Sequence, residues 1–587
     1  MVDDSNMPSN HTGGRVDASG RRSWSWPARA LLPYRQGRVL DVVVYLLILV
    51  IVAAGVVHAL TASVPAATFR ISDDAYYYFN VARNVITGKG VTFDGINATN
   101  GFHPLWMLCV LPIFGVFAGD PEIALRAALV LVTLVAGAAF AVAYGCLRAH
   151  AGRAAAVVGL AAMCAPLCLN PLLNGLETGL LLVLLFATLW ACGRYNLLAP
   201  TASPRGTIVL AVLLSLVFLC RLDSVFIIFA VLLVTGCRRR ATVLPAMPSR
   251  PWWAVYTRLA LVAAALAGPY FLWNFAHFGR LTPISGALKS TFPTPSLSLS
   301  RLLSPHLLLA GAELVFAGLM LAWLVRPADP AVPARPSIAS APATALKADR
   351  PSYDMLVAMW IGCVLHFVYS AVFMRWGVQW WHFAAYVPVT LTLGVLAFAR
   401  LHARLRQRVW VSVATCVLVL TGSLGALHVD AQRRGAHHDP WYAAALWARR
   451  HLPAEAVVGM TDCGLFGYFC NRPTVNLDGV INGYEYQRAL RDGKLSSYLR
   501  RCGVTHVADY ETRYAKDEHV IRLPARLYQA PGGSIVASPP AEVYRSQPYA
   551  DAVHPEGGIR FVIWDLTGVR VVDRAVPSRD TLAQGRP

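Results

Sequence analysis

The chain has 587 residues, of which 56% are hydrophobic and only 14% charged, and its mean hydropathy is +0.48. Soluble domains carry roughly a quarter charged residues, so this composition excludes a water-soluble globular protein, and the abundance of apolar residues excludes disorder. What remains is a polytopic α-helical membrane protein with room for one soluble domain. The formal net charge of +20 would suit a nucleic-acid partner only if it were concentrated in a soluble domain.

Apolar segments near the length of about 20 residues that a helix needs to cross a bilayer occur eleven times. They are 41–63, 123–147, 153–170, 176–193, 206–220, 222–236, 254–275, 305–325, 353–373, 380–399 and 408–428. A shorter apolar stretch, 104–118, begins at Pro104 and is expected to form a juxtamembrane helix. If it crossed the membrane, five arginine-bearing loops would move to the outer side, against the positive-inside rule. These loops are Arg148–Arg153, Arg194–Arg205, Arg238–Arg258, Arg326–Arg350 and Arg400–Arg408.

The charge distribution therefore predicts eleven spans, a cytoplasmic N-terminus and an outer C-terminus. Residues 429–587 hold 20 Lys and Arg against 17 Asp and Glu, so most of the surplus positive charge precedes the end of the last span. There it lies beside anionic lipid, and no nucleic-acid partner is expected. The predicted parts are a cytoplasmic tail 1–40, a transmembrane domain 41–428 with a first outer loop 64–122 and a Pro/Ala-rich cytoplasmic linker 326–351, and an outer domain 429–587.

The outer domain has mixed polarity and is predicted to be α/β. Its β-rich runs are Ala456–Met460, Val504–Ala508, Ile559–Trp564 and Val569–Val572, with helical stretches at 440–450 and 485–500. The twelve cysteines include no CxxC pair and therefore no zinc-site spacing. A disulfide is permitted outside the cytoplasm, and whether Cys463 and Cys470 form one is left open.

The first outer loop concentrates unusual polar residues. Ser72 is a plausible N-cap, which places Asp73 and Asp74 at the start of a helix that runs to about Thr87. Adjacent acids at a helix start are often mere caps, favoured by the helix dipole. Here three tyrosines, including Tyr77, follow them, and further along the loop come the amide and imidazole groups of Asn100 and His103. Aromatic faces beside amides and carboxylates suit a carbohydrate.

Other outer ends of the spans carry ionisable groups close to the hydrocarbon, where such groups are costly and therefore usually functional. Glu177 lies between the third and fourth spans, and Arg221 and Asp223 lie between the fifth and sixth, where a self-satisfied ion pair is the alternative reading. Lys289 follows the seventh span and Arg375 follows the ninth. Cations at this interface can hold a lipid-linked phosphate.

Two motifs of the first loop carry a family resemblance. Residues 72–79 (SDDAYYYF) followed by 100–106 (NGFHPLW) resemble the first outer loop of GT-C membrane glycosyltransferases, a superfamily that includes protein O-mannosyltransferases, oligosaccharyltransferases, aminoarabinose transferases and arabinofuranosyltransferases. The turn 175–178 (GLET) and the segments 462–468 (DCGLFGY) and 476–479 (NLDG) are similar to a bacterial branch that has a DDAYYY loop and an outer C-terminal domain. The oligosaccharyltransferase motif WWDYG is absent, so transfer to peptide asparagine is not expected.

The resemblance implies a GT-C-like fold, a polyprenyl-phosphate sugar donor and a catalytic acid in the first loop. It implies transfer of a hexosyl or pentosyl group on the periplasmic face of a bacterial inner membrane, to an envelope glycan, lipid or protein. We expect inversion, with Asp74 or Asp73 as general base and Asp74 slightly favoured. Binding roles are expected for Tyr77, Asn100, His103, Glu177, Arg221, Asp223, Lys289 and Arg375.

Two questions stay open at this point. No metal ligand is assigned, and a divalent metal ion is left undecided because metal dependence varies within the superfamily. The alternative function is a transporter or flippase of lipid-linked or acidic solutes. Transporters carry ionisable groups near the bilayer midplane and often have two repeated halves, whereas the polar residues here gather at one face.

Overall fold

The computed structural model describes residues 32–573 apart from 118, 199–201, 242–251, 327–349, 405–408, 435–438, 512–513, 516–519, 524–533, 537–540 and 550–557. Most of the predicted cytoplasmic tail and linker therefore lies outside the described residues. The chain divides into two compact units, Met1–Val50 and Ile51–Pro587. The first contains the beginning of helix α1 (Leu32–Thr61), and the second contains the candidate site.

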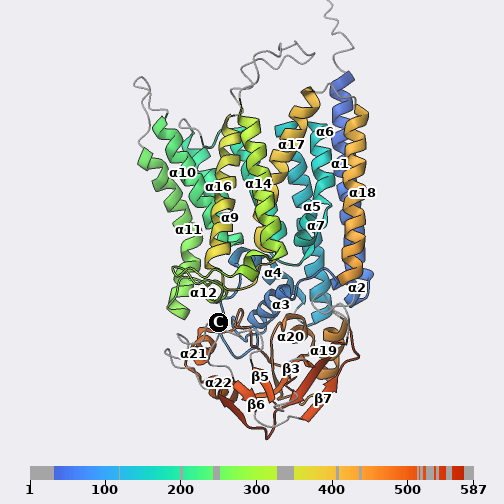
Figure 1. Ribbon diagram of the computed structural model, residues 1–587, viewed down its shortest axis with the longest axis vertical. Helices are drawn as coiled ribbons and strands as arrows, with labels where there is room; N and C mark the ends of the chain where they lie inside the picture. Colours follow the sequence, from blue (N-terminus) through green and yellow to red (C-terminus); the bar gives the residue numbers. More distant parts are fainter. Residues whose placement is uncertain are drawn as a thin grey trace, which may run out of the picture. The chain divides into compact units, whose positions relative to one another are not determined.

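Helices dominate the second unit up to residue 451 (Figure 1). In chain order they are α2 (Val64–Thr68), α3 (Asp73–Ile86), α4 (Pro104–Phe117), α5 (Pro121–Ala151), α6 (Arg153–Met163), α7 (Pro166–Leu173), α8 (Thr178–Tyr195), α9 (Pro204–Cys220), η2 (Leu222–Ser224), α10 (Val225–Ala241), α11 (Trp252–Phe278), α12 (Ile284–Lys289), α13 (Leu299–Leu302), α14 (Pro305–Val325), α16 (Arg350–Phe373), η3 (Trp380–Tyr386), α17 (Val387–Arg404), α18 (Val409–Arg434) and α19 (Asp439–His451).

Three long helices begin with a polar cap followed by proline. Asp120 accepts hydrogen bonds from the backbone N–H groups of Glu122 and Ile123 at the start of α5. Ser203 and Ser304 cap α9 and α14 in the same way, and a proline follows each of the three caps. Proline suits the first helical position because its missing N–H would have no intrahelical partner there, and the side-chain oxygen satisfies another of the free donors. Local sequence thus fixes where these helices start.

Each of the eleven predicted spans coincides with a helix. Fewer than eleven of these helices, however, are long and apolar enough to qualify as membrane spans. In the described part of the chain, seven helices are long and apolar enough to cross a membrane. The predicted single span 153–170 is instead two helices, α6 and α7, bent by 69°, which would make an eighth span if the pair is counted as one. Proline at 166 explains the break, since it cannot continue the helix before it. The shorter apolar helices include α4, α9 and the apolar part of α18, Val413–Ala426.

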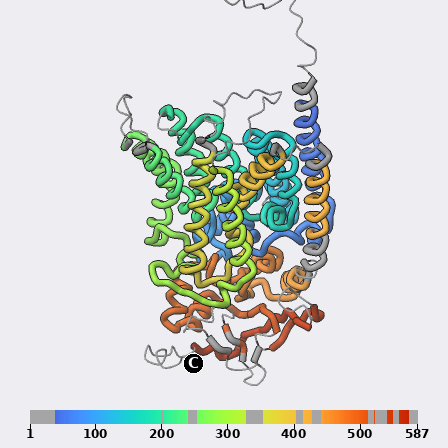
Figure 2. The backbone as a smooth tube through the Cα atoms, turned by 45° about the horizontal axis from the view of Figure 1, so that its top comes forward, coloured from blue at the N-terminus to red at the C-terminus, as the bar shows by residue number. Residues whose placement is uncertain are grey.

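The segments after residue 451, coloured dark orange to red, gather at one end of the helices (Figure 2). They form helices α20 (Gly464–Phe469), α21 (Tyr484–Arg491) and α22 (Leu495–Arg501), and strands β1 (Val457–Met460), β2 (Thr474–Asn476), β3 (Val504–Tyr510), β4 (Tyr514–Ala515), β5 (Val520–Leu523), β6 (Ser534–Val536), β7 (Ala541–Arg545), β8 (Phe561–Asp565) and β9 (Val571–Asp573). These segments, for which we keep the name outer domain, confirm the predicted α/β character and the four predicted strand runs. The predicted helical stretch 440–450 is α19, whereas the stretch 485–500 is two helices, α21 and α22, separated at Asp492–Lys494. Cys463 and Cys470, whose pairing the sequence left open, are both free thiols.

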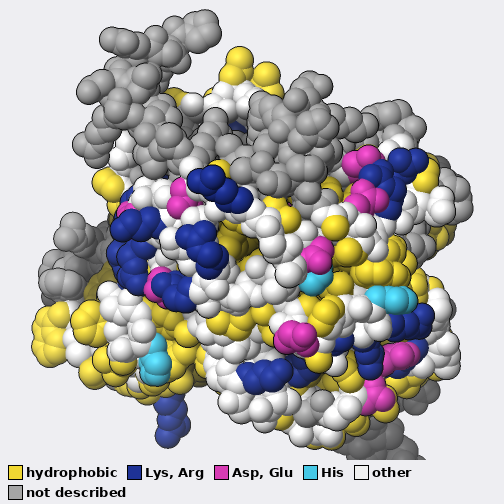
Figure 3. All heavy atoms as spheres, turned by 90° about the horizontal axis from the view of Figure 1, so that it is seen from below, with side chains coloured by type: hydrophobic (Ala, Val, Ile, Leu, Met, Phe, Trp, Pro, Cys, Tyr) yellow, Lys and Arg dark blue, Asp and Glu magenta, His cyan; other side chains and the backbone are white. Residues whose placement is uncertain are grey.

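The outer domain contains two sheets. The five-stranded sheet has the order β2-β1-β3-β8-β7, and β1 runs parallel to both β2 and β3 while β8 runs antiparallel to β3. The four-stranded sheet has the order β4-β5-β6-β9 and is antiparallel. Parallel neighbours need crossover connections, and α20 supplies the crossover between β1 and β2. On the face of this domain shown in Figure 3, basic side chains lie in several separate groups, with acidic ones beside some of them.

A shared core joins the first outer loop to the outer domain. The helix predicted to start after Ser72 is α3, and nine of its side chains are buried. Tyr76 of α3 lies 5.6 Å from Tyr468 of α20, and Phe79 stacks on Phe114 of α4 at 6.0 Å, both measured between ring centroids. These residues belong to one hydrophobic cluster that also includes residues of β1, β3 and β8. The loop is therefore fixed between the helices and the outer domain.

Candidate functional site

A pocket of about 80 Å³ opens where α3, the starts of α8 and η2, and α12 meet the outer domain. Its wall combines carboxylates, cations, aromatic rings and one residue of the outer domain. The lining residues are Asp74, Tyr77, Tyr78, Gly101, His103, Leu176, Glu177, Arg221, Ser285, Lys289, Trp381, His382 and Val480. Six of the ten residues singled out in the sequence are therefore in this wall: Asp74, Tyr77, His103, Glu177, Arg221 and Lys289.

Asp73 and Asp74 are adjacent but face different surroundings. The two carboxylate oxygens of Asp73 accept hydrogen bonds from the backbone N–H groups of Gly464 at 2.8 Å and Leu465 at 2.7 Å, at the start of α20. Burial and the nearby charge of Asp462 raise the pKa of Asp73 to about 7, against the lowering effect of these two hydrogen bonds. Asp74 instead lines the pocket. Asp73 thus joins the first loop to the outer domain, and Asp74 is the acid of the pair that substrate can reach.

Glu177 is the centre of a buried polar cluster. Its Oε1 accepts a hydrogen bond from Arg221 Nη1 at 2.8 Å and lies 3.6 Å from His103 Nε2, while its Oε2 accepts from the Tyr78 hydroxyl at 3.2 Å. Glu177 is 2% exposed and Arg221 3%. Buried charges are stable only when paired and hydrogen-bonded, and this pair meets that condition.

The turn that presents Glu177 requires glycine. Gly175 has a φ of +81°, and a Cβ there would lie 2.8 Å from the Ala75 side chain of α3. The first loop also holds this turn through the Trp106 indole, which donates to the Gly175 carbonyl at 3.1 Å, and through the Ser72 N–H, which donates to the Asn174 carbonyl at 2.9 Å. The turn 175–178 and the first loop therefore form one structural unit.

The polar cluster continues from Arg221 towards α16. Arg221 Nε donates to both oxygens of Asp223, at 3.0 and 3.1 Å, and His366 Nε2 of α16 lies 3.6 Å from Asp223 Oδ2. His366 Nδ1 lies 3.0 Å from the Tyr386 hydroxyl. Burial would raise the pKa of Asp223, but Arg221 and His366 outweigh burial and hold it below its usual value. Asp223 therefore remains charged and fixes the Arg221 guanidinium at the pocket wall.

Two other predicted residues make contacts with the protein rather than line the pocket. The amide of Asn100 donates to Asn274 Oδ1 at 2.7 Å, and its oxygen accepts from the Ile284 N–H at 2.9 Å. Arg375 is exposed, and its Nε donates to the Leu288 carbonyl at 2.7 Å. Both contacts position α12, which carries Lys289 to the pocket.

The protonation state of His103, one of the two imidazoles in the pocket wall, follows from its burial. Burial lowers the pKa of His103, with Arg221 and Lys289 acting in the same direction and Glu177 opposing them. His103 is therefore neutral near pH 7. The Leu222 N–H lies 3.4 Å from His103 Nδ1, so in the neutral ring Nδ1 accepts and Nε2 carries the proton on the side of Glu177.

The sequence did not single out Ser285, Trp381, His382, Val480 or His366 as site residues. Val480 reaches the pocket because the outer domain and the first loop approach closely: a Cβ on Gly101 would lie 2.2 Å from the Val480 carbonyl oxygen. No local pattern predicts such a contact between segments so far apart in the chain. His366 did carry a signal, because an ionisable side chain within an apolar span is costly.

Metal binding was left undecided by the sequence. Among the residues that the structure describes, no three or more His, Cys, Asp or Glu side chains are grouped so that they could hold a metal ion.

Comparison with known proteins gives one matching domain and several solved structures that are similar to this chain. Residues 428–547, less than half of the chain, match a domain of unknown function, DUF8728. No curated protein matches the sequence. The crystal structure of ArnT from Cupriavidus metallidurans bound to undecaprenyl phosphate is similar, with 13% identity and a TM-score of 0.53, over 88% of this chain and 97% of ArnT.

Two further structures are similar with lower TM-scores. ArnT from Cupriavidus metallidurans in the apo state has 15% identity and a TM-score of 0.46, over 75% of this chain and 88% of ArnT. The archaeal oligosaccharyltransferase AglB from Archaeoglobus fulgidus, in complex with an inhibitory peptide and a dolichol-phosphate, has 14% identity and a TM-score of 0.44, over 79% of this chain and 69% of AglB. At these identities, the likeness to bound ArnT shows that the chain shares its fold.

Proposed function

We propose that this protein is a membrane glycosyltransferase that moves a sugar from a polyprenyl-phosphate donor to an acceptor hydroxyl. The observation that carries the proposal is the pocket itself, in which the Asp74 carboxylate shares a wall with Lys289 and Arg221. A base for the acceptor and cations for a lipid phosphate are the two requirements of this reaction. The shared fold with ArnT, whose structure contains undecaprenyl phosphate, supports the same class of donor.

Asp74 is the general base in this mechanism. Its carboxylate takes the proton of the acceptor hydroxyl as the oxygen attacks the anomeric carbon from the face opposite the phosphate. The new C–O bond forms as the bond to the phosphate oxygen breaks, with inversion, and the electron pair leaves with the lipid phosphate. The proton then passes from Asp74 to solvent. Glu177 is a poorer base because Arg221 and Tyr78 already donate to its two oxygens.

The cations of the pocket stabilise the leaving phosphate. A phosphate leaves as an anion without protonation, so the second carboxylic acid that a glycosidase needs is not required. Lys289 is a mobile point charge, whereas Arg221 is held in place by Glu177 and Asp223. Stabilisation of charge by groups already oriented in a water-poor pocket is a large contribution to catalysis.

We also propose that the chain crosses the membrane eleven times, in a bacterial inner membrane, with the pocket on the periplasmic side. The ends of the helices support this count. Glu177 precedes α8 and Arg221 follows α9, and the two side chains are bonded, so α8 runs away from the pocket and α9 returns to it. With 17 residues at 1.5 Å each, α9 spans about 25 Å. Helix α10 begins just after η2 at the pocket, and its Arg238 pairs with Asp354 near the start of α16. Helices α6 and α7 together lead from the far end of α5 back to Asn174, and α18 leads from the end of α17 back to the C-terminal domain. With α9, these helices bring the count from seven to eleven.

The acceptor is an envelope glycan, lipid or protein, and the sugar is a hexose or a pentose. The test is release of undecaprenyl phosphate by purified full-length protein from a panel of undecaprenyl-phosphate hexoses and pentoses, with envelope extract as acceptor. Asp74→Asn should lower turnover by about 10²–10⁴-fold, the value of general-base help. Asp73→Asn, the matched neighbour outside the pocket, should retain more activity.

Two outcomes would contradict the proposal. Near-wild-type turnover in both aspartate variants would remove the first-loop base. Movement of the lipid-linked sugar across reconstituted vesicles without any release of undecaprenyl phosphate would favour the transporter.

A further inference from the structure

A second pocket, of about 180 Å³, lies between the ends of four helices. It is lined by Ala149 and His150 of α5, Trp190, Gly193 and Arg194 of α8, Tyr353 and Leu356 of α16, and Leu396 of α17. Nothing in the proposed transfer reaction uses these residues.

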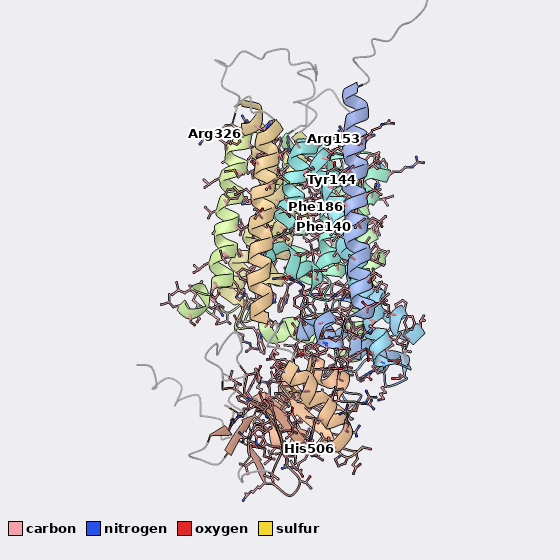
Figure 4. The ribbon with its side chains drawn as sticks, turned by 90° about the vertical axis from the view of Figure 1, so that its right-hand side faces the viewer. Phe140, Tyr144, Arg153, Phe186, Arg326 and His506 are labelled. Carbon is pink, nitrogen blue, oxygen red and sulfur yellow. The ribbon has the colours of Figure 1, made fainter. Side chains whose placement is uncertain are left out.

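This pocket is at the end of the helices opposite the candidate site. Helix α8 begins just after Glu177, at the candidate site, and reaches Arg194 some 17 residues later, a rise of about 25 Å. Helix α5 likewise begins beside the outer domain, where the Tyr468 hydroxyl donates to the Pro121 carbonyl at 2.5 Å, and His150 is near its far end. Figure 4 shows Arg153 and Arg326 at this end and His506 in the outer domain at the other. The second pocket is therefore one membrane thickness away from the first.

The chemistry of the second pocket combines a cation with aromatic rings. Among the residues that the structure describes, Arg194 has no acidic partner within ion-pair distance; its guanidinium lies 5.5 Å from the centre of its neighbour's ring, Tyr195. Trp190 is 39% exposed and packs edge-on against Tyr195, with 6.0 Å between ring centroids. Exposed Trp and Tyr at a span end are typical of the membrane–water interface. The pocket thus offers an exposed guanidinium at the depth of lipid headgroups.

We propose that this pocket binds the phosphate of an anionic phospholipid from the leaflet on its own side of the membrane. Basic pockets between transmembrane helices on the arginine-rich side take up such headgroups. Arginine is suited to the contact because its planar guanidinium can give a phosphate two parallel hydrogen bonds. The Tyr353 phenol adds a polar group, and Leu356 and Leu396 line the apolar part beside the glycerol and the start of the acyl chains.

A lipid is favoured over a soluble phosphate compound by the apolar half of the lining. Trp190 and the two leucines would remain in contact with water if only a free anion occupied the pocket, whereas a phospholipid covers them as well. The bound lipid would fill the space between α5, α8, α16 and α17. It would therefore stabilise the helices that carry the candidate site at their other ends.

The test is lipid retention by full-length protein in detergent, measured by native mass spectrometry with added dioleoyl-phosphatidylglycerol or dioleoyl-phosphatidylcholine. The wild type should retain phosphatidylglycerol preferentially, and Arg194→Gln should weaken that retention about five- to tenfold. Arg194→Lys should keep part of it. The matched control is Arg205→Gln, an exposed arginine at the start of α9 on the same side that does not line the pocket; it should bind as the wild type does.

A second variant tests the same pocket independently, in case Arg194→Gln does not fold. Ala149→Asp places a negative charge on an exposed position of the lining and should also weaken phosphatidylglycerol retention. Equal retention in wild type, Arg194→Gln and Ala149→Asp would overturn the proposal, as would an equal loss in Arg205→Gln. If inorganic phosphate at about 10 mM displaces all of the bound lipid, a soluble phosphate and not a phospholipid is the occupant of the pocket. Retention is measured without turnover, so it is independent of the proposed transfer reaction.

Discussion

Two neighbouring carboxylates in one helical turn have different tasks. The oxygens of Asp73 both accept hydrogen bonds from the start of α20, while Asp74 faces the pocket with Tyr77 and His103. Successive residues of a helix point about 100° apart, so one acid can bind the outer domain while the next faces substrate. A DD pair thus lets one short segment both hold the loop and supply a base.

The raised pKa of Asp73 predicts a pH-dependent stability. In the unfolded chain this carboxyl has a pKa of 3.8, and in the folded protein about 7, so folding favours the protonated form. Its contribution to stability is complete below about pH 4, declines as the pH rises towards 7, and is lost above the folded pKa. In thermal unfolding between pH 5 and 8, the wild type should lose more stability than Asp73→Asn, which cannot titrate. Parallel curves for the two proteins would show that Asp73 does not titrate in this range.

The contact between α3 and α20 is a close approach of the two backbones. A Cβ on Gly464 would lie 2.1 Å from the Asp73 carbonyl oxygen. A change of side-chain rotamer could not relieve this clash, because the carbonyl oxygen belongs to the backbone. Glycine at this position lets the start of α20 reach the Asp73 carboxylate. Glycine at position 464 is therefore a packing requirement of this contact.

Gly464→Ala should destabilise the protein by about 1–3 kcal/mol, the usual cost of overpacking, and should lower turnover because α3 carries Asp74. Thermal unfolding and release of undecaprenyl phosphate are the two measurements. The control is Gly394→Ala in α17, where a Cβ meets no atom within 4 Å and alanine favours the helix. If both variants unfold at the wild-type temperature, the contact between α3 and α20 is not as close as described.

The elements differ in how well the sequence predicts them. Helix α3, the strands β1, β3, β8 and β9, and a helix at each apolar segment follow from caps and hydrophobic periods, which are local. The bend between α6 and α7 was not predicted, although Pro166 was visible. The site was predicted where one segment holds several polar groups, as in the first loop. Val480 and His366 were missed because tertiary packing, rather than sequence spacing, brings Val480 to the pocket of Asp74 and His366 to Asp223.

The topology of the chain distinguishes three span counts. Seven helices qualify by length and composition, eight do if α6 and α7 form one span, and the direction of the helices supports eleven. If the N-terminus is inside, as its arginines favour, the three counts put two points of the chain on different sides of the membrane. These points are the linker at Ser340 and the chain end at Pro587.

Reporter fusions at these points separate the three counts. Alkaline phosphatase is active only outside the cytoplasm, and green fluorescent protein exported in unfolded form fluoresces only inside it. Eleven spans predict Ser340 inside and Pro587 outside; seven predict both outside; eight predict both inside. We expect the first pattern, because the transfer reaction that we propose takes place on the periplasmic side and requires Val480 and Asp74 to lie there. A fluorescent fusion at Pro587, with the N-terminus also inside, would contradict the eleven-span arrangement and move the candidate site to the cytoplasmic face.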